Sequence, residues 1–146
     1  MKQLNEKHLH GIDQKGRLQL SRDLRRVLKL KKGDALHLLP AAGGQPHLEI
    51  RTSAQWKDYT ERFLGQAPGG RKRDFMRFVE LTMETVTADA QGRLSIPRRL
   101  RELCRLDGQV AVINMTFCVE VWNIDFVGAK WNEFARAFED FNDSLL

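Results

Sequence analysis

Hydrophobic and polar residues follow the same order twice along the chain. Segments 8–20 and 83–96 alternate apolar and polar residues around a central turn, which is typical of short β-strands. Each is followed by a short helical pattern, two more strand-like segments and an amphipathic helix. The pattern therefore predicts two β-β-α-β-β-α halves, with a further helix bridging them, and an α+β fold class.

The first helix of each half carries an apolar stripe at i, i+3 and i+4 spacing, which predicts that it faces a core. The stripes consist of Leu24, Val27 and Leu28 in the first half and of Leu100, Leu103 and Cys104 in the second. Ser21 is placed to cap the first helix. Gly33 and Gly108 are predicted to end the two helices, because glycine favours the conformation that terminates a helix.

The second helix of each half is rich in aromatic residues, at 53–65 and 124–141. Aromatic residues at helical spacing are usually core residues, so both stripes are predicted to be buried in the fold. The alternative is burial against another subunit, because a half of this size offers little surface to cover such a helix. Segment 65–74 has the composition of a linker, and the apolar residues that follow it predict the bridging helix.

The two halves share a repeat with an offset of 76 residues. From Asp13 to Leu30, eight of eighteen positions are identical to those from Asp89 to Leu106, well above the one identity that chance would supply. Two copies indicate duplication of a half-domain. We expect the halves, 1–67 and 68–146, to form one structural domain, since strand pairs split by a helix favour a single intertwined barrel.

Each copy of the repeat contains a D-x-x-G turn followed by an arginine. Asp13 and Asp89 stand at the first turn position, where a carboxylate accepts backbone N–H groups. Gly16 and Gly92 stand where a positive φ is needed. The flanking strands are expected to pair as a hairpin, with Arg17 and Arg93 on its returning strand.

The repeat also holds the excess of positive charge. The chain has a net charge of +5, with 24 basic and 19 acidic side chains. Residues 15–32 contain eight basic side chains and one acid, and residues 93–105 contain five and one. The rest of the chain is mildly acidic, so the repeat itself is expected to meet an anionic partner.

The sequence argues against an enzyme or a metal protein. Motifs for phosphate binding, dinucleotide binding, a nucleophile elbow or a zinc protease do not occur in it. Cys104 and Cys118 lie in apolar segments without metal-ligand spacing, and we expect two buried thiols. We expect neither cofactor nor metal. The absence of an apolar leader or of a membrane-length apolar segment predicts a soluble, cytoplasmic protein.

Two D-x-x-G-R turns at this spacing, each followed by an Arg-rich helix and by a "LEI" or "VEVW" strand, resemble the MraZ family of bacterial transcriptional regulators. The resemblance covers about residues 9–138, although Ser21 stands where the family has proline. It implies a pseudo-twofold, swapped-hairpin (AbrB-like) double barrel. It also implies a nucleoid-associated, ring-shaped homo-oligomer that binds direct repeats of double-stranded DNA in the promoter of the division and cell-wall gene cluster, as a repressor.

DNA binding is also expected from the residues, since arginine forks pair with phosphate or guanine and a hairpin tip fits a major groove. The candidate contacts are Lys15, Arg17, Arg22, Arg25, Gln91, Arg93, Arg98 and Arg101. The helix arginines among them are expected to face outward. Two alternatives stay open. Arg17 and Arg93 can instead bond Asp13 and Asp89 and close the turns, and the barrel can instead bind an acidic protein or RNA.

Overall fold

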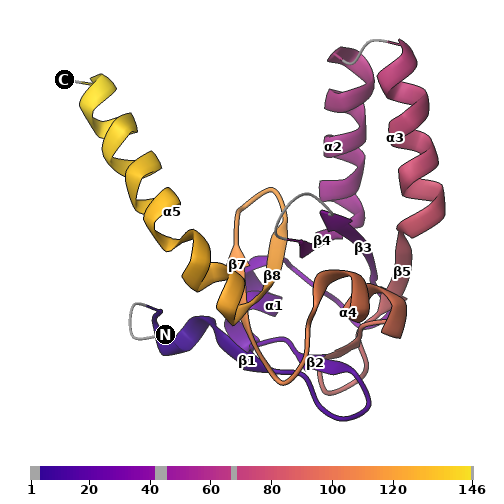
Figure 1. Cartoon of the computed structure of the whole chain (residues 1–146). Helices are drawn as coiled ribbons and strands as arrows, with labels where there is room; N and C mark the ends of the chain where they lie inside the picture. Colours follow the sequence, from indigo (N-terminus) through magenta and orange to yellow (C-terminus); the bar gives the residue numbers. More distant parts are fainter. Residues whose placement is uncertain (1–3, 42–45, 67–68, 146) are drawn as a thin grey trace.

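The computed structural model describes residues 4–41, 46–66 and 69–145, and its elements follow the predicted order (Figure 1). The first half comprises a 3-10 turn (Glu6–His8), β1 (Leu9–Gly11), β2 (Arg17–Gln19), α1 (Arg22–Val27), β3 (Ala35–Ala41), β4 (His47–Thr52) and α2 (Ser53–Gln66). The second half comprises β5 (Glu84–Thr87), β6 (Arg93–Ser95), α4 (Arg98–Cys104), β7 (Gln109–Asn114), β8 (Val119–Asn123) and α5 (Ile124–Leu145). The bridging helix α3 spans Gly69–Thr82. The fold is mixed α+β, with antiparallel sheets.

The strands of the two halves interleave. One sheet has the order β1-β7-β8-β4-β3-β5, and a second sheet consists of β2 and β6. The pair β1–β7 corresponds to the pair β5–β3, because strands 76 residues apart occupy the same places in the two halves. The pairs β4–β8 and β2–β6 each join a strand of the first half to its counterpart in the second. The arrangement therefore has an approximate twofold relation, and each half completes its sheets with strands of the other.

The predicted hairpins around the two turns differ from the observed pairing. β1 pairs with β7, and β2 pairs with β6. The two sides of the first turn meet only close to the turn itself, through the bridge between Ile12 and Leu18 and the bonds between Asp13 and Arg17. Strands of three residues give little stability as an isolated hairpin. Pairing β2 with β6 instead places Leu18 opposite Leu94, and both side chains are fully buried.

The core lies between the sheets and the two short helices, and both halves contribute to it. Leu24, Leu100 and Cys104 are buried as predicted. Val27 and Leu103 are not: they are 60% and 44% exposed. Because helices of six and seven residues bury only a narrow face, the side chains three residues after Leu24 and Leu100 point away from the core.

Both short helices end before the predicted glycines. Lys29 and Arg105 adopt positive φ angles of 55° and 53°. At the end of α1 the N–H groups of Leu30 and Lys29 bond the carbonyls of Arg25 and Arg26, which is a Schellman motif with a non-glycine residue at its left-handed position. The early end turns Leu30, like its counterpart Leu106, back onto the core. Gly33 and Gly108 lie in the loops beyond.

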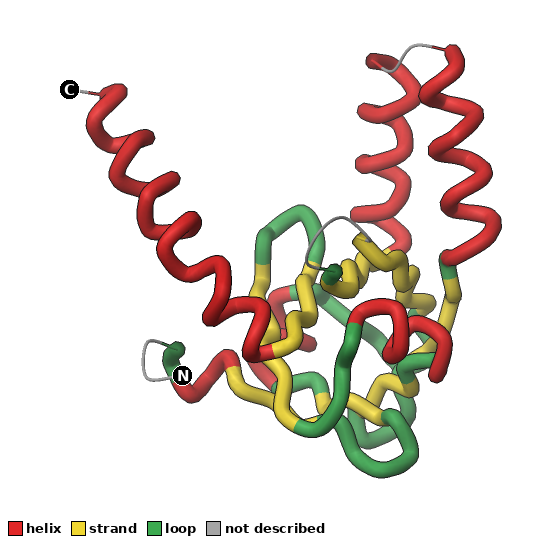
Figure 2. The backbone as a smooth tube through the Cα atoms, viewed as in Figure 1, coloured by secondary structure: helices red, strands yellow, loops and turns green. Residues whose placement is uncertain are grey.

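The segment predicted as a linker is largely helical. α2 extends to Gln66 and α3 begins at Gly69, and only residues 67–68 of the segment lie outside the described chain. The two helices pack as an antiparallel pair (Figures 1 and 2). Phe75 of α3 contacts Phe63 of α2, with ring centroids 4.0 Å apart. The first aromatic stripe is thus half-buried against the bridging helix.

The second aromatic stripe is not part of the core. α5 leaves the body of the molecule alone (Figure 1), and within the described chain Val127 is its one buried residue. Phe134 and Phe138 are 38% and 69% exposed. The prediction of a core position is therefore wrong for most of α5, because none of the elements that the structure describes covers this helix beyond its first turns.

Candidate nucleic-acid interface

The two D-x-x-G turns have the predicted geometry. In the first, the carboxylate of Asp13 accepts hydrogen bonds from the N–H groups of Lys15 and Arg17, each 2.9 Å long. Asp89 accepts equivalent bonds from Gln91 and Arg93. Gly16 and Gly92 have φ angles of 80° and 78°. In both carboxyls the hydrogen bonds from the backbone N–H and the side chain of the turn arginine keep the pKa below its usual value and outweigh the opposing effect of desolvation.

The arginines of the two turns have one of their two predicted roles, which is to close the turn on its own aspartate. Arg17 donates from Nε to Asp13 at 2.8 Å, and Arg93 does so to Asp89 at 2.7 Å, so both close their turns. The Nε bond uses one donor of five in each guanidinium. The terminal nitrogens of Arg17 form no hydrogen bond within the described chain, and Arg93 forms one, to Gln91. Both terminal nitrogens of Arg17 and one of Arg93 therefore remain available while the inner nitrogen of each fork is held.

The interleaved strands bring the two turns side by side at one end of the molecule, opposite the long helices (Figure 1). The N–H of Leu20 donates to the carbonyl of Gly92, and the N–H of Ile96 donates to that of Gly16. The side chain of Gln19 reaches the carbonyl of Gln91 at 2.9 Å. The turns therefore form one paired surface, although 76 residues separate them in the sequence.

Arg25 and Arg101 do not face outward as predicted. Each is half-buried, and its guanidinium lies against the turn glycine of the other half. A Cβ atom at Gly92 would lie 2.7 Å from the guanidinium of Arg25, and one at Gly16 would lie 2.7 Å from that of Arg101. Arg101 also donates to the carbonyl of Ile96. Both arginines are thus supports of the paired turns, because the turn glycines leave room for them.

The other candidate residues lie on the surface. Lys15, Arg22, Gln91 and Arg98 are exposed. Arg98 forms an ion pair with Glu102 at 2.9 Å, which costs little to break because both side chains are largely exposed. Arg22 forms no hydrogen bond or ion pair within the residues that the structure describes.

Lys31 and Lys32 belong to the same surface, although neither was among the candidates. Together with Arg25 they line a hollow of about 160 Å³ beside Asp89 and Gly92. Their counterparts in the second half are Asp107 and Gly108, and the carbonyl of Gly108 bonds the chain next to the first turn. The crossing of the halves thus places the basic loop of the first half next to the second turn. The excess of basic residues in segment 15–32 includes these lysines, but the sequence did not show that they lie beside the second turn.

The remaining features limit the chemistry of the surface. Burial raises the pKa of the Cys104 and Cys118 thiols to about 12, and both side chains are buried, as predicted. Among the described residues, none of the helices combines the length and the apolar character that crossing a membrane requires. The paired turns offer charged hydrogen-bond donors on an exposed surface, which suits an anionic polymer.

The sequence of this chain is similar to those of several known proteins. Residues 4–69 and 81–144 match the family model described as "MraZ protein, putative antitoxin-like". The chain is 29% identical over 139 residues to the transcriptional regulator MraZ of Mycoplasmoides gallisepticum, with 92% of this chain and 94% of that protein covered. It is 31% identical over 144 residues to the protein of the same name from Moorella thermoacetica, with 93% and 89% covered. For that of Chromobacterium violaceum the identity is 32% over 116 residues, with 79% and 77% covered.

Proposed function

The chain belongs to the MraZ family, and from this premise we propose that it is a DNA-binding transcriptional regulator and not an enzyme. The single observation that carries the proposal is the pair of exposed turns, each with an anchored arginine whose outer edge is open. Two guanidinium groups held on one surface suit the phosphates and guanine edges of a duplex. The finer proposals are binding to direct repeats in a promoter, repression, and a swapped-hairpin double barrel as the scaffold.

The second turn is proposed as the stronger DNA contact. Arg93 has Lys31 and Lys32 beside its turn, whereas the first turn has Asp107 and Gly108 nearby in the equivalent loop. Cations close to a contact add phosphate neutralisation and so raise affinity. We therefore expect Arg93→Ala to weaken DNA binding more than Arg17→Ala, measured as dissociation constants at one salt concentration.

Assembly into a ring is proposed as part of the mechanism, because one monomer offers a single paired surface to the DNA. Several copies on one duplex make the later contacts effectively intramolecular, which yields avidity for repeated sites. The helix end of the molecule supports this, since α5 has an uncovered apolar stripe. The stripe consists of Phe134, Phe138, Phe141 and Leu145, at one face of the helix.

A complementary surface lies on α3. This helix has four basic and two acidic residues and exposes Met76 and Leu81, whereas α5 has five acidic and two basic residues. The two helices stand apart in one copy (Figure 1). We propose that α5 of one copy packs on α3 of the next. Such a head-to-tail contact closes into a ring if the rotation permits, and it leaves the turns at the other end free.

The alternative function is a barrel that binds an acidic protein or RNA. The discriminating experiment measures binding of the full chain to duplex with direct repeats, to random duplex and to single-stranded RNA over a range of salt concentrations. The proposed function predicts a preference for repeated duplex that survives competitor DNA. Equal binding to all three polymers, with the same salt dependence, would contradict it.

A second experiment separates DNA contact from turn closure. Asp89→Asn keeps an oxygen that accepts the backbone N–H groups but removes the ion pair with Arg93. If Arg93 contacts DNA, Asp89→Asn keeps or improves affinity because a negative charge is lost, whereas Arg93→Ala weakens it. If Arg93 only closes the turn, the two variants weaken DNA binding to the same extent.

A further inference from the structure

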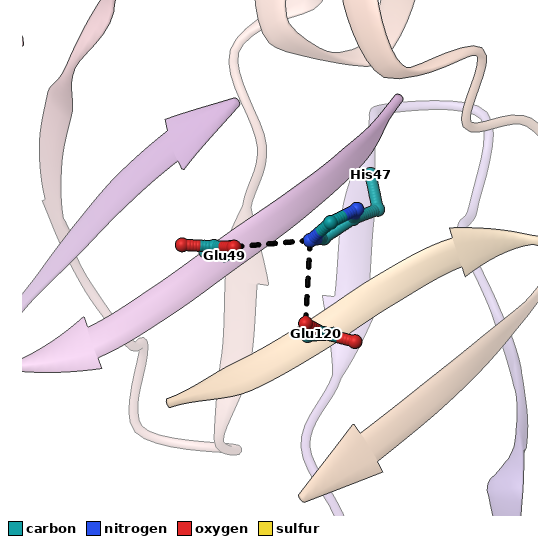
Figure 3. Close-up of side chains that lie close together, drawn as sticks. All are labelled: His47, Glu49 and Glu120. Carbon is teal, nitrogen blue, oxygen red and sulfur yellow. Dashed lines mark hydrogen bonds and ion pairs between the residues drawn. The ribbon is translucent and has the colours of Figure 1, made fainter. Parts of the chain in front are cut away.

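Three side chains that bind metals in proteins converge on the outer face of the large sheet (Figure 3). Glu49 of β4 and Glu120 of β8 are register partners, and His47 lies two residues before Glu49 and therefore on the same face. The Nε2 atom of His47 lies 3.0 Å from Oε2 of Glu49 and 3.3 Å from Oε2 of Glu120. The three potential ligand atoms lie within 4.8 Å of one another.

We propose that His47, Glu49 and Glu120 form a binding site for a divalent transition-metal ion of the Zn²⁺ type. Zinc bonds to histidine nitrogen and carboxylate oxygen are about 2.0–2.2 Å long, so adjacent ligand atoms of a tetrahedral site lie about 3.3–3.5 Å apart. The two distances from His47 need to lengthen by only a few tenths of an ångström. Three protein ligands leave the fourth position for water, in a mixed nitrogen and oxygen set that suits zinc or cobalt. This departs from the absence of a metal site expected from the sequence.

The groups around the cluster hold the ligands in place. Arg51 donates from Nη1 to Oε1 of Glu49 at 2.9 Å, and Trp122 donates from Nε1 to Oε1 of Glu120 at 2.9 Å. Each carboxylate thus has one oxygen fixed by a donor and the other directed at His47. The imidazole of His47 stacks on the ring of Trp122, with centroids 4.4 Å apart. Hydrogen bonds to the non-ligating atoms orient carboxylates in this way around bound metals.

A proton and a metal ion compete for the Nε2 atom of His47. One N–H of His47 has two acceptors in different directions, and its other ring nitrogen, Nδ1, is buried without a partner in the described chain. A metal ion replaces this proton and bonds all three ligands at once. Because an imidazole must be neutral to bind a metal ion, metal binding tightens as the pH rises.

The site joins the two halves of the fold. β4 belongs to the first half and β8 to the second, and they pair in the middle of the large sheet. Because a ligand that binds only the folded state stabilises it, a bound metal raises the melting temperature. It also fixes Trp122, whose ring contacts Phe134 of α5 edge-on, with centroids 6.0 Å apart.

Titration of the purified, metal-stripped full chain with Zn²⁺ by calorimetry, and with Co²⁺ by visible absorption, tests the proposal. We expect one ion per chain, a tetrahedral cobalt spectrum and a higher melting temperature. Glu120→Gln and His47→Gln each remove a ligand and should weaken binding by more than about tenfold. Trp122→Phe removes the supporting donor, replaces the stacked indole by a smaller ring, and should weaken binding by about tenfold. His37→Gln, a histidine bonded to Thr85 and Ser53 elsewhere on the sheet, is the matched control.

Unchanged metal affinity in both Glu120→Gln and His47→Gln would overturn the site, as would a wild-type chain that binds neither ion at micromolar concentration. Circular dichroism of each metal-free variant shows whether it is folded. If one of the two ligand variants does not fold, the other and Trp122→Phe decide the question.

Discussion

At the residue scale, glycine is needed in each turn for two reasons, its backbone conformation and the absence of a side chain. Gly92 has a φ of 78°, and the guanidinium of Arg25 occupies the space where a side chain would begin. Gly92→Ala should therefore lower the free energy of unfolding by about 1 kcal/mol or more, because alanine disfavours positive φ and displaces the supporting arginine.

Gly11→Ala is the matched control for that prediction, since Gly11 has no positive φ and no neighbour within 4 Å of an added Cβ. Urea unfolding of both variants gives the comparison. Equal stability of the two variants would show that the packing of Arg25 on the turn is not required.

The two thiols provide a second prediction at this scale. Burial raises the pKa of Cys104 and Cys118 to about 12, so at pH 8 almost no thiolate is present in the folded chain. Both cysteines should resist a thiol-specific chromogenic reagent until denaturant is added, and then both should react. Rapid labelling of one thiol in the native protein would contradict the burial of that residue.

At the element scale, α5 is the helix whose apolar face lacks a partner in the described part of its own chain. Phe138 is 69% exposed. If this face packs on α3 of another copy, Phe138→Glu should reduce the mass measured by light scattering to the 16.9 kDa of one chain without loss of helical content.

Asn132→Ser, at an exposed position on the opposite face of α5, is the control and should leave the assembly unchanged. Wild-type protein that already scatters as a monomer would contradict the proposed contact. So would a Phe138→Glu variant that assembles normally.

The sequence predicted a feature correctly where neighbouring residues in the chain determine it. The D-x-x-G turns and the Ser21 cap involve only neighbouring residues, and the structure confirms them. The exchange of β2 and β6 between halves was not predictable from periodicity alone, because Leu18 has the same alternating pattern in either pairing. The burial of Arg25 follows from that exchange, so its outward placement was wrong for the same reason.

The cluster of His47, Glu49 and Glu120 shows the same limit. Glu49 and Glu120 are 71 positions apart, and nothing local links them. Their proximity depends on the register of β4 against β8. The aromatic stripe of α5 was a different case: its periodicity predicted an apolar face correctly but could not distinguish a partner in the same chain from one in another.

At the scale of the whole molecule, the turns and the long helices occupy opposite ends (Figure 1). The contacts proposed between copies through α3 and α5 would therefore not compete with DNA for the turns. Because cooperation between copies multiplies weak contacts, a duplex with two correctly spaced repeats should bind about 10²-fold or more tightly than one with a single repeat. The Phe138→Glu variant should lose that difference and keep the affinity for a single repeat.

The central claim is that the paired turns themselves contact DNA. The most direct test is the affinity of the double variant Arg17→Ala with Arg93→Ala for duplex DNA from upstream of its own gene, with scattering and circular dichroism as controls for assembly and folding. Two lost arginine contacts predict an affinity about thirtyfold weaker or more, at unchanged oligomeric mass. Wild-type affinity in a folded, assembled double variant would contradict the claim and leave the two arginines with turn closure alone.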